Sequence, residues 1–330
     1  MAKTKKGTTK NTASRKDLDY FGILKNAFSM VRHNRYLWYL GILAGGGFGS
    51  GFNGGGGGGN PGDFFQKNKE NSASAASSTQ TSPSFDINQV WADVARWMQD
   101  NWLLVAILAS IVLVLIVIMT ILSSMAKAGL VSVVNNLSKN EESSFGKAMR
   151  FGWHKWWNVF GAGFLIGLTV FVIFAIIAVP VVALWFVNSI IGVFVTLLAL
   201  PVFFFIAVLG GVVSEYTLRY ISLKEGKAVA SIKNGLGLMK SVKKETFFIW
   251  LITVGVAMVA GIILVIAILI AALILVLLGL LFFILSPIAG MIYAGIAIMA
   301  FVVALFVVGG FISSLISAYW TLCFKEFETV

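Results

Sequence analysis

Residues 246–324 read TFFIWLITVGVAMVAGIILVIAILIAALILVLLGLLFFILSPIAGMIYAGIAIMAFVVALFVVGGFISSLISAYWTLCF, and none of these 79 side chains carries a charge. Two further charge-free stretches, of 59 and 26 residues, cover 156–214 and 101–126. A helix that crosses the hydrocarbon core of a bilayer needs about 20 apolar residues. The three stretches therefore predict an all-α integral membrane protein with several transmembrane helices.

Composition and charge distribution support this class and predict an orientation. The chain has 330 residues, of which 58% are hydrophobic, and its mean hydropathy is +0.90. Soluble domains are usually about 45–50% apolar. The net charge is +11, and 21 of the 25 Lys and Arg residues fall within 3–35, 127–155 and 219–244. Because basic loops stay in the cytoplasm, we expect a plasma-membrane protein with both termini cytoplasmic.

The chain divides into segments that differ in charge and hydropathy. A helix is expected to begin at Asp17 or Asp19, since either carboxylate can cap it. The predicted segments are a basic tail without fixed structure over 1–16, an interfacial helix and marginal first span over 17–53, a Gly/Ser-rich external linker over 54–86, an external interfacial helix and second span over 87–140, and two further hairpins over 141–224 and 225–330.

The first apolar segment, 36–52, is short for a span and rich in glycine. Gly45 and Gly49 form a small-xxx-small pair through which another helix could approach. The same glycines could instead begin the linker, and a cleaved signal peptide is a third interpretation. Cleavage would leave the linker on the same outer side.

Several short motifs recur along the chain. The segment Leu24–Phe28 resembles Ile232–Leu236, and Gly210-Gly211 with Ser214 matches Gly309-Gly310 with Ser313. These matches predict three parallel repeats of an interfacial amphipathic helix plus a helical hairpin, and hence about six transmembrane helices. Residues 246–324 could hold two long helices or three shorter ones, because Ser286-Pro287 would break a helix near the middle. The repeat favours two.

The residues needed for most enzyme chemistry are scarce. Neither His33 nor His154 has an acidic neighbour three or four positions away that could orient it as a base, and Cys323 is the single cysteine. We therefore expect no enzyme, cofactor or metal site; an interfacial enzyme would have to use Asp93, Asp100 or Glu215. Glu215 and Arg219, four residues apart, are expected to pair with each other, and a functional gate at this place is the alternative. No recognition motif for nucleic acid accompanies the basic charge.

Lipids and partner helices are the contacts that the sequence favours. The side chains expected to meet anionic lipid headgroups or a partner protein are Lys25, Arg32, Arg35, Lys147, Arg150, Lys155, Lys240, Lys243 and Lys244. The glycines expected at helix contacts, including a homo-oligomer interface, are Gly45, Gly49, Gly163, Gly167, Gly210, Gly211, Gly309 and Gly310. Two functions stay open: a non-enzymatic scaffold or complex subunit, and a transporter or channel for an apolar or lipid-like substrate.

Three short motifs carry a family resemblance. They are ILKNA at 23–27, NRYLW at 34–38 and Ser144-Phe145 at the start of the middle interfacial helix. With this layout, the chain resembles prokaryotic multi-pass membrane proteins related to the membrane domain associated with glycerophosphodiester phosphodiesterases. The resemblance implies a six-span domain of unclear role. It transfers no catalytic residue, because the chain has no soluble domain that could be the phosphodiesterase.

Overall fold

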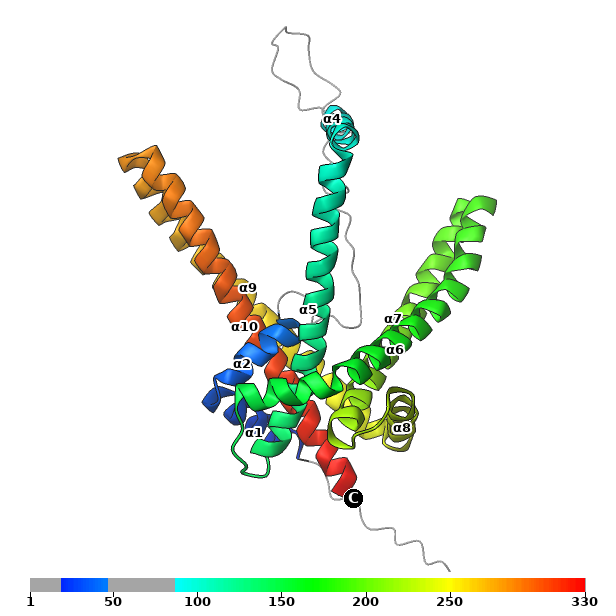
Figure 1. Cartoon of the computed structure of the whole chain (residues 1–330). Coiled ribbons are helices and arrows are strands. Elements are labelled where there is room, and N and C mark those ends of the chain that lie inside the picture. The colour runs from blue at the N-terminus through cyan, green and yellow to red at the C-terminus, as the bar shows by residue number, and fades with distance from the viewer. Residues whose placement is uncertain (1–18, 47–86, 330) are drawn as a thin grey trace, which may run out of the picture. The chain divides into compact units, whose positions relative to one another are not determined.

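The computed structural model describes residues 19–46 and 87–329, and every regular element in these ranges is a helix (Figure 1). The chain forms two units, a larger one within 1–54 and 122–330 and a smaller one within 55–121. The predicted basic tail, the Gly/Ser-rich linker and Gly49 lie outside the described residues.

The larger unit begins with α1 (Tyr20–His33). The side chain of Asp19 accepts a hydrogen bond from the backbone N–H of Gly22 at 2.9 Å, so the cap predicted at Asp17 or Asp19 is Asp19. The helix ends at Asn34, whose side-chain amide donates to the carbonyl of Met30 at 2.9 Å. This bond competes with helix continuation, as asparagine commonly does.

The first apolar segment forms α2 (Tyr36–Gly41) and the π-helical turn η1 (Ile42–Gly46). Gly45 has a φ of 119°, a conformation that favours glycine, so it breaks the helix rather than extending it. The described apolar helix, Tyr36–Gly45, is too short to span a membrane by itself. The prediction of six transmembrane helices therefore stays a prediction.

The smaller unit contains α4 (Ile87–Asp100) and the beginning of α5 (Trp102–Leu137). Apart from Val105, the large apolar side chains of α5 from Trp102 to Met119 are exposed. Its two hydroxyl groups in this region, on Ser110 and Thr120, donate to carbonyls one turn earlier in the same helix at 2.8 Å. The exposed surface of this helix is therefore apolar, and its hydroxyl groups are hydrogen-bonded within the helix, as in a helix that faces lipid.

Two helical hairpins make up most of the larger unit. In the first, α6 (Phe145–Val187) packs along α7 (Ser189–Leu223), and in the second, α9 (Lys243–Leu285) packs along α10 (Pro287–Thr329). The side chain of Asn188 caps α7, and the second hairpin turns at Ser286, where Pro287 starts α10. Residues 246–324 thus form two helices, as the repeat predicted, and not three.

The expected interfacial helices differ between the proposed repeats. In the third, α8 (Ala228–Ser241) is separated from α9 by a break at Val242. In the middle one, the predicted separate helix is wrong, because α6 runs without interruption from Phe145 into the span. Residues 151–157 contain no Asn, Ser or Pro that would end the helix. The repeat itself remains a prediction.

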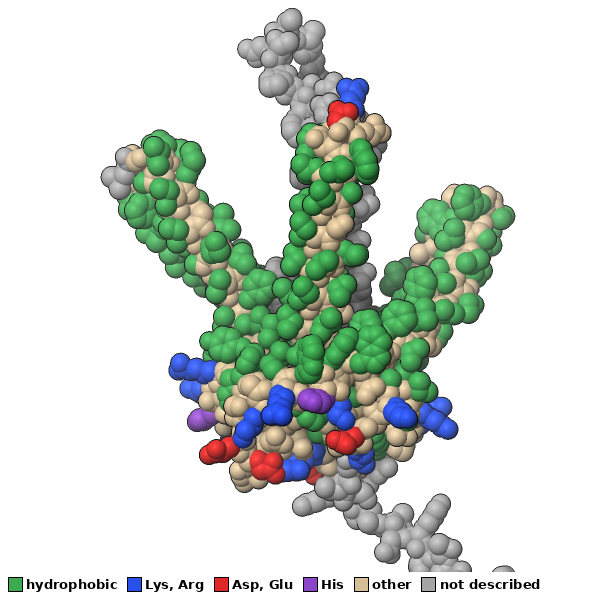
Figure 2. Space-filling model, in the orientation of Figure 1, with side chains coloured by type: hydrophobic (Ala, Val, Ile, Leu, Met, Phe, Trp, Pro, Cys, Tyr) green, Lys and Arg blue, Asp and Glu red, His purple; other side chains and the backbone are tan. Residues whose placement is uncertain are grey.

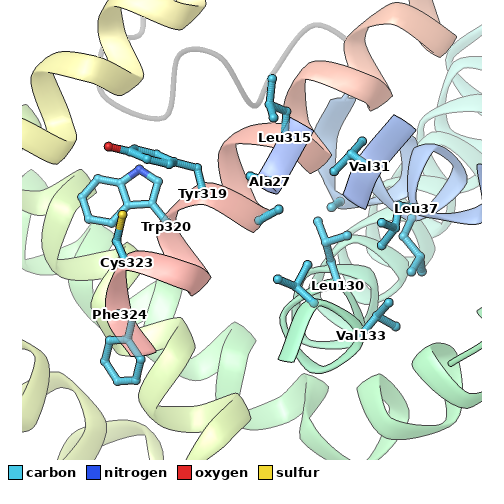
Figure 3. Close-up of a cluster of buried hydrophobic side chains, with 14 of the residues drawn as sticks. Ala27, Val31, Leu37, Leu130, Val133, Leu315, Tyr319, Trp320, Cys323 and Phe324 are labelled. Carbon is cyan, nitrogen blue, oxygen red and sulfur yellow. The ribbon is translucent and has the colours of Figure 1, made fainter. Parts of the chain in front are cut away.

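The buried core lies at the end of the larger unit that is distant from the hairpin turns. Figure 3 shows Ala27 and Val31 of α1 near Leu130 of α5, with Tyr319 and Phe324 on α10. Away from this core, the hairpins expose large apolar side chains. Within the described ranges, five helices are long and apolar enough to cross a bilayer: α5, α6, α7, α9 and α10. The chain is a multi-pass membrane protein.

Candidate functional site

Charged side chains gather at the core end of the larger unit. Figure 2 shows them in a band below the hydrophobic surface of the hairpins. Two features of this region are relevant to function. One is a buried arginine, and the other is a basic surface beside exposed aromatic residues.

The buried arginine is Arg219 of α7, whose side chain has no exposed surface. Its Nη1 group donates to the side-chain carboxylate of Glu215 and, at 2.8 Å, to the Glu215 backbone carbonyl. Its Nη2 group donates to the carbonyl of Ser317 in α10 at 3.2 Å. The predicted pair therefore forms between a buried Arg219 and a partly exposed Glu215, and the bond to Ser317 connects the two hairpins.

A cavity of about 70 Å³ adjoins this pair. Its polar lining includes Lys127, Glu215 and the two serines, Ser214 and Ser313, that the proposed repeat matches. Within this lining, Glu215 is engaged by Arg219, which also bonds to Ser317 of α10. The pair therefore joins α7 to α10 beside the cavity.

Other polar bonds also join distant helices in this region. The hydroxyls of Tyr216 in α7 and Thr246 in α9 are 2.8 Å apart. Ser314 of α10 donates to the carbonyl of Leu37 in α2 at 2.6 Å. Lys325 donates to the hydroxyl of Ser138, which follows α5, at 2.6 Å. Such bonds stabilise helix association where little water competes.

The basic residues predicted to meet headgroups are almost all exposed. They lie on α1 and the turn that follows it, at the start of α6, and around the break between α8 and α9: Lys25, Arg32, Arg35, Lys147, Arg150, Lys240, Lys243 and Lys244. Lys155 is the exception, because its side chain is mostly buried and lies 3.7 Å from the carboxylate of Glu225.

Tryptophans adjoin this basic surface. On α6, Trp153 and Trp157 are 59% and 65% exposed, and they follow Arg150 by one and two helical turns. Tryptophan prefers the boundary between headgroups and hydrocarbon. The two tryptophans therefore lie where the headgroups of a bilayer would meet its hydrocarbon. The basic side chains would then lie on the aqueous side of that boundary.

The glycine predictions had mixed outcomes. A Cβ added at Gly163 or Gly167 would meet no atom of the chain within 4 Å, so these glycines make no close helix contact within the chain, and a contact with another chain there stays a prediction. Gly210 does lie at a contact, because its Cβ would come within 2.7 Å of Val170 in α6. Gly310 also lies at a helix contact, because it packs closely on Trp38 and Ile42. Gly211 and Gly309 are adjacent in sequence to Gly210 and Gly310.

Three glycines outside the predicted set also lie at close helix contacts. Gly41 of α2 lies against Gly310 and Ser314 of α10. Gly129 of α5 lies against Ala148 of α6, and Gly152 of α6 lies against Met125 of α5. Gly41 has small-xxx-small spacing with Gly45, and Gly152 has it with Ala148, so this signal could have identified both. Gly129 has no such neighbour, and only the helix crossing identifies it.

The acidic candidates are divided between the two units, and the two histidines lie in the larger one. Asp100 is exposed on α4 of the smaller unit, whereas Glu215 belongs to the larger unit; the side chain of Asp93 lies outside what the structure describes. The Nδ1 atoms of His33 and His154 lie 3.1 Å and 2.9 Å from carbonyls of their own helices. Among the described residues, no group of three or more His, Cys, Asp or Glu is placed to hold a metal.

Comparison with known proteins places the chain in a family. The model of the family of unknown function DUF7544 matches residues 40–322, so the chain belongs to that family. No curated protein and no solved structure gives a significant match. The family match covers the larger unit from α2 onward and the smaller unit, but it leaves the resemblance to phosphodiesterase-associated membrane domains a prediction.

Proposed function

We propose that this member of the DUF7544 family is a non-enzymatic membrane protein that acts as a scaffold or complex subunit through contacts with anionic lipids. The observation that carries the proposal is the set of exposed Lys and Arg side chains beside exposed tryptophans at one end of the larger unit. A basic residue near an anionic bilayer surface contributes about 1 kcal/mol to binding. Several such residues together give a strong preference for anionic headgroups.

The same charges support an orientation in the plasma membrane. Basic side chains near the ends of spans stay in the cytoplasm, so α1, α8 and both termini are assigned to that side. The first sixteen residues add Lys3, Lys5, Lys6, Lys10, Arg15 and Lys16 to the cytoplasmic charge. This charge would draw the tail to the anionic lipids of the inner leaflet.

Neutralising the basic surface is expected to reduce lipid preference several-fold. In a variant with Lys25, Arg32, Lys147 and Arg150 all replaced by glutamine, spin-labelled phosphatidylglycerol should lose most of its advantage over phosphatidylcholine at the protein surface. High salt should reduce the wild-type preference in the same way, because it screens exposed charges. Electron spin resonance of the reconstituted protein measures both effects.

The matched control exchanges lysine for arginine and arginine for lysine at the same four positions, which keeps the charge. Its lipid preference should equal that of the wild type. A wild-type protein that associates equally with both lipids would contradict the proposal. Protein-dependent movement of labelled lipid between the leaflets would instead favour the transporter function.

The turn of the second hairpin is expected to be accessible from outside the cell. The charge-free part of α9, Thr246–Leu285, has 40 residues and is about 60 Å long at 1.5 Å per residue. Even at a tilt of about 40° it covers roughly 46 Å, more than the core of about 30 Å. A membrane-impermeant maleimide added outside should label Ser286→Cys, while the buried native Cys323 stays unlabelled. Labelling only from inside would reverse the proposed orientation.

A further inference from the structure

An apolar groove lies where α7, α8 and α9 meet, and it encloses about 510 Å³. Its walls include Phe204, Phe205 and Leu209 of α7 and Phe247 and Trp250 of α9. Ligand sites in proteins typically enclose about 300–1,000 Å³ and are mostly apolar. The groove is thus large enough for part of a lipid chain.

One end of the groove is basic. Lys240 in the last turn of α8 and Lys243, the first residue of α9, both line it, on either side of the helix break at Val242. Among the described residues, neither ammonium group makes a hydrogen bond or an ion pair; both side chains are exposed. The two positive charges therefore lack an acidic partner at the place where the groove reaches the basic surface.

The start of α9 adds to the attraction for an anion at this end. No side chain caps the first turn of α9, which leaves its backbone N–H groups available. A helix N-terminus favours phosphate through these groups and through the helix dipole. Thr246, the remaining polar residue of the lining apart from the lysines, is already hydrogen-bonded through its hydroxyl to Tyr216 at 2.8 Å. The groove is therefore polar at one end only.

We propose that this groove binds one anionic phospholipid, with an acyl chain between α7 and α9 and the phosphate between Lys240 and Lys243. A lipid matches the groove because it too is apolar along its length and anionic at one end. A soluble anion would leave the aromatic walls exposed, and a neutral hydrophobic ligand would leave both lysines unpaired. The inference deepens the proposed function, since it adds one retained lipid to a general surface preference.

The test is native mass spectrometry of the full chain in mild detergent, with phosphatidylglycerol and phosphatidylcholine added in equal amounts. One phosphatidylglycerol per chain is expected on the wild type. The double variant Lys240→Gln, Lys243→Gln should bind it about 30-fold more weakly, from about 1 kcal/mol per surface charge. The matched control, Lys227→Gln with Lys233→Gln, removes two exposed charges at the start of α8 and within it, outside the groove, and should keep the lipid.

A second variant tests the apolar half of the site. Leu209→Trp adds bulk at a partly exposed position in the groove, so it should reduce lipid retention without changing the charge. Equal retention by the wild type and the Lys240/Lys243 variant would overturn the inference, as would unchanged retention in Leu209→Trp. If either occurs while the surface preference measured by spin resonance persists, the groove proposal fails alone. If the surface preference is also missing, the proposed function fails.

Discussion

Replacing Glu215 with glutamine is expected to lower the free energy of unfolding by about 3 kcal/mol, because it leaves the buried Arg219 guanidinium without a counter-charge. The Arg219 side chain has no exposed surface, whereas the Glu215 side chain is 34% exposed. Water at Glu215 can compensate in part, so the effect should lie at the lower end of the range of about 3–5 kcal/mol for broken buried pairs. Glutamine has nearly the same shape as glutamate, so the loss of unfolding free energy reports the loss of the negative charge.

Cys323 provides the measurement. It is the single cysteine of the chain and is fully buried, so its reaction with a thiol-reactive dye reports unfolding of the purified protein. Glu225→Gln is the control, because Glu225 is 79% exposed and its pairing with Lys155 at 3.7 Å should contribute less than about 1 kcal/mol. The double variant Glu215→Gln, Arg219→Met should be more stable than Glu215→Gln alone, since it removes the unpaired cation. A Glu215→Gln variant as stable as Glu225→Gln would contradict the argument.

The fold class could be read from the sequence because a bilayer imposes simple requirements. Uninterrupted apolar length predicts spanning helices, and the break at Ser286-Pro287 follows from the missing N–H of proline. The helix start at Asp19 was also predictable, since a capping carboxylate acts on a residue three positions away. These are local properties, and local properties are visible in sequence.

The candidate site was less predictable because its chemistry depends on contacts between distant segments. The spacing of Glu215 and Arg219 predicts a pair, but the burial of Arg219 comes from α10, where Ser317 lies 98 positions away. In the same way, the groove forms only when α7 lies beside the break between α8 and α9. Sequence predicted that Lys240 and Lys243 would be exposed and basic, but it could not predict the aromatic walls next to them.

Glycine spacing is also an incomplete guide to helix contacts. Gly163 and Gly167 have the small-xxx-small spacing expected of a helix contact, yet no other atom of the chain lies within 4 Å of a Cβ added at either. Gly41 has the same spacing with Gly45, and it lies at one of the closest contacts. Glycine spacing shows which helix faces could allow close approach, and the partner helix decides which of them is used.

Alanine at Gly41 or Gly310 is therefore expected to destabilise the protein, by about 1–3 kcal/mol each, because overpacking forces backbones apart. The Cβ of alanine at Gly41 would overlap the carbonyl oxygen of Gly310 and the hydroxyl of Ser314. At Gly310 it would overlap Ile42 and come within 2.6 Å of the Trp38 carbonyl oxygen. The bond from Ser314 to the Leu37 carbonyl, 2.6 Å long, would be strained as well.

Gly163→Ala and Gly167→Ala are the matched controls, and the expected sign is reversed. With no atom within 4 Å of the added Cβ, these substitutions should be neutral or should stabilise α6 by up to about 1 kcal/mol through helix propensity. Dye labelling of Cys323 should begin at a lower temperature in the Gly41 and Gly310 variants than in either control. Since α2 contacts α10 through this pair, early labelling would show that the first apolar segment holds the core closed around Cys323. Equal labelling temperatures for all four variants would mean that the close contact of α2 with α10 contributes little to stability.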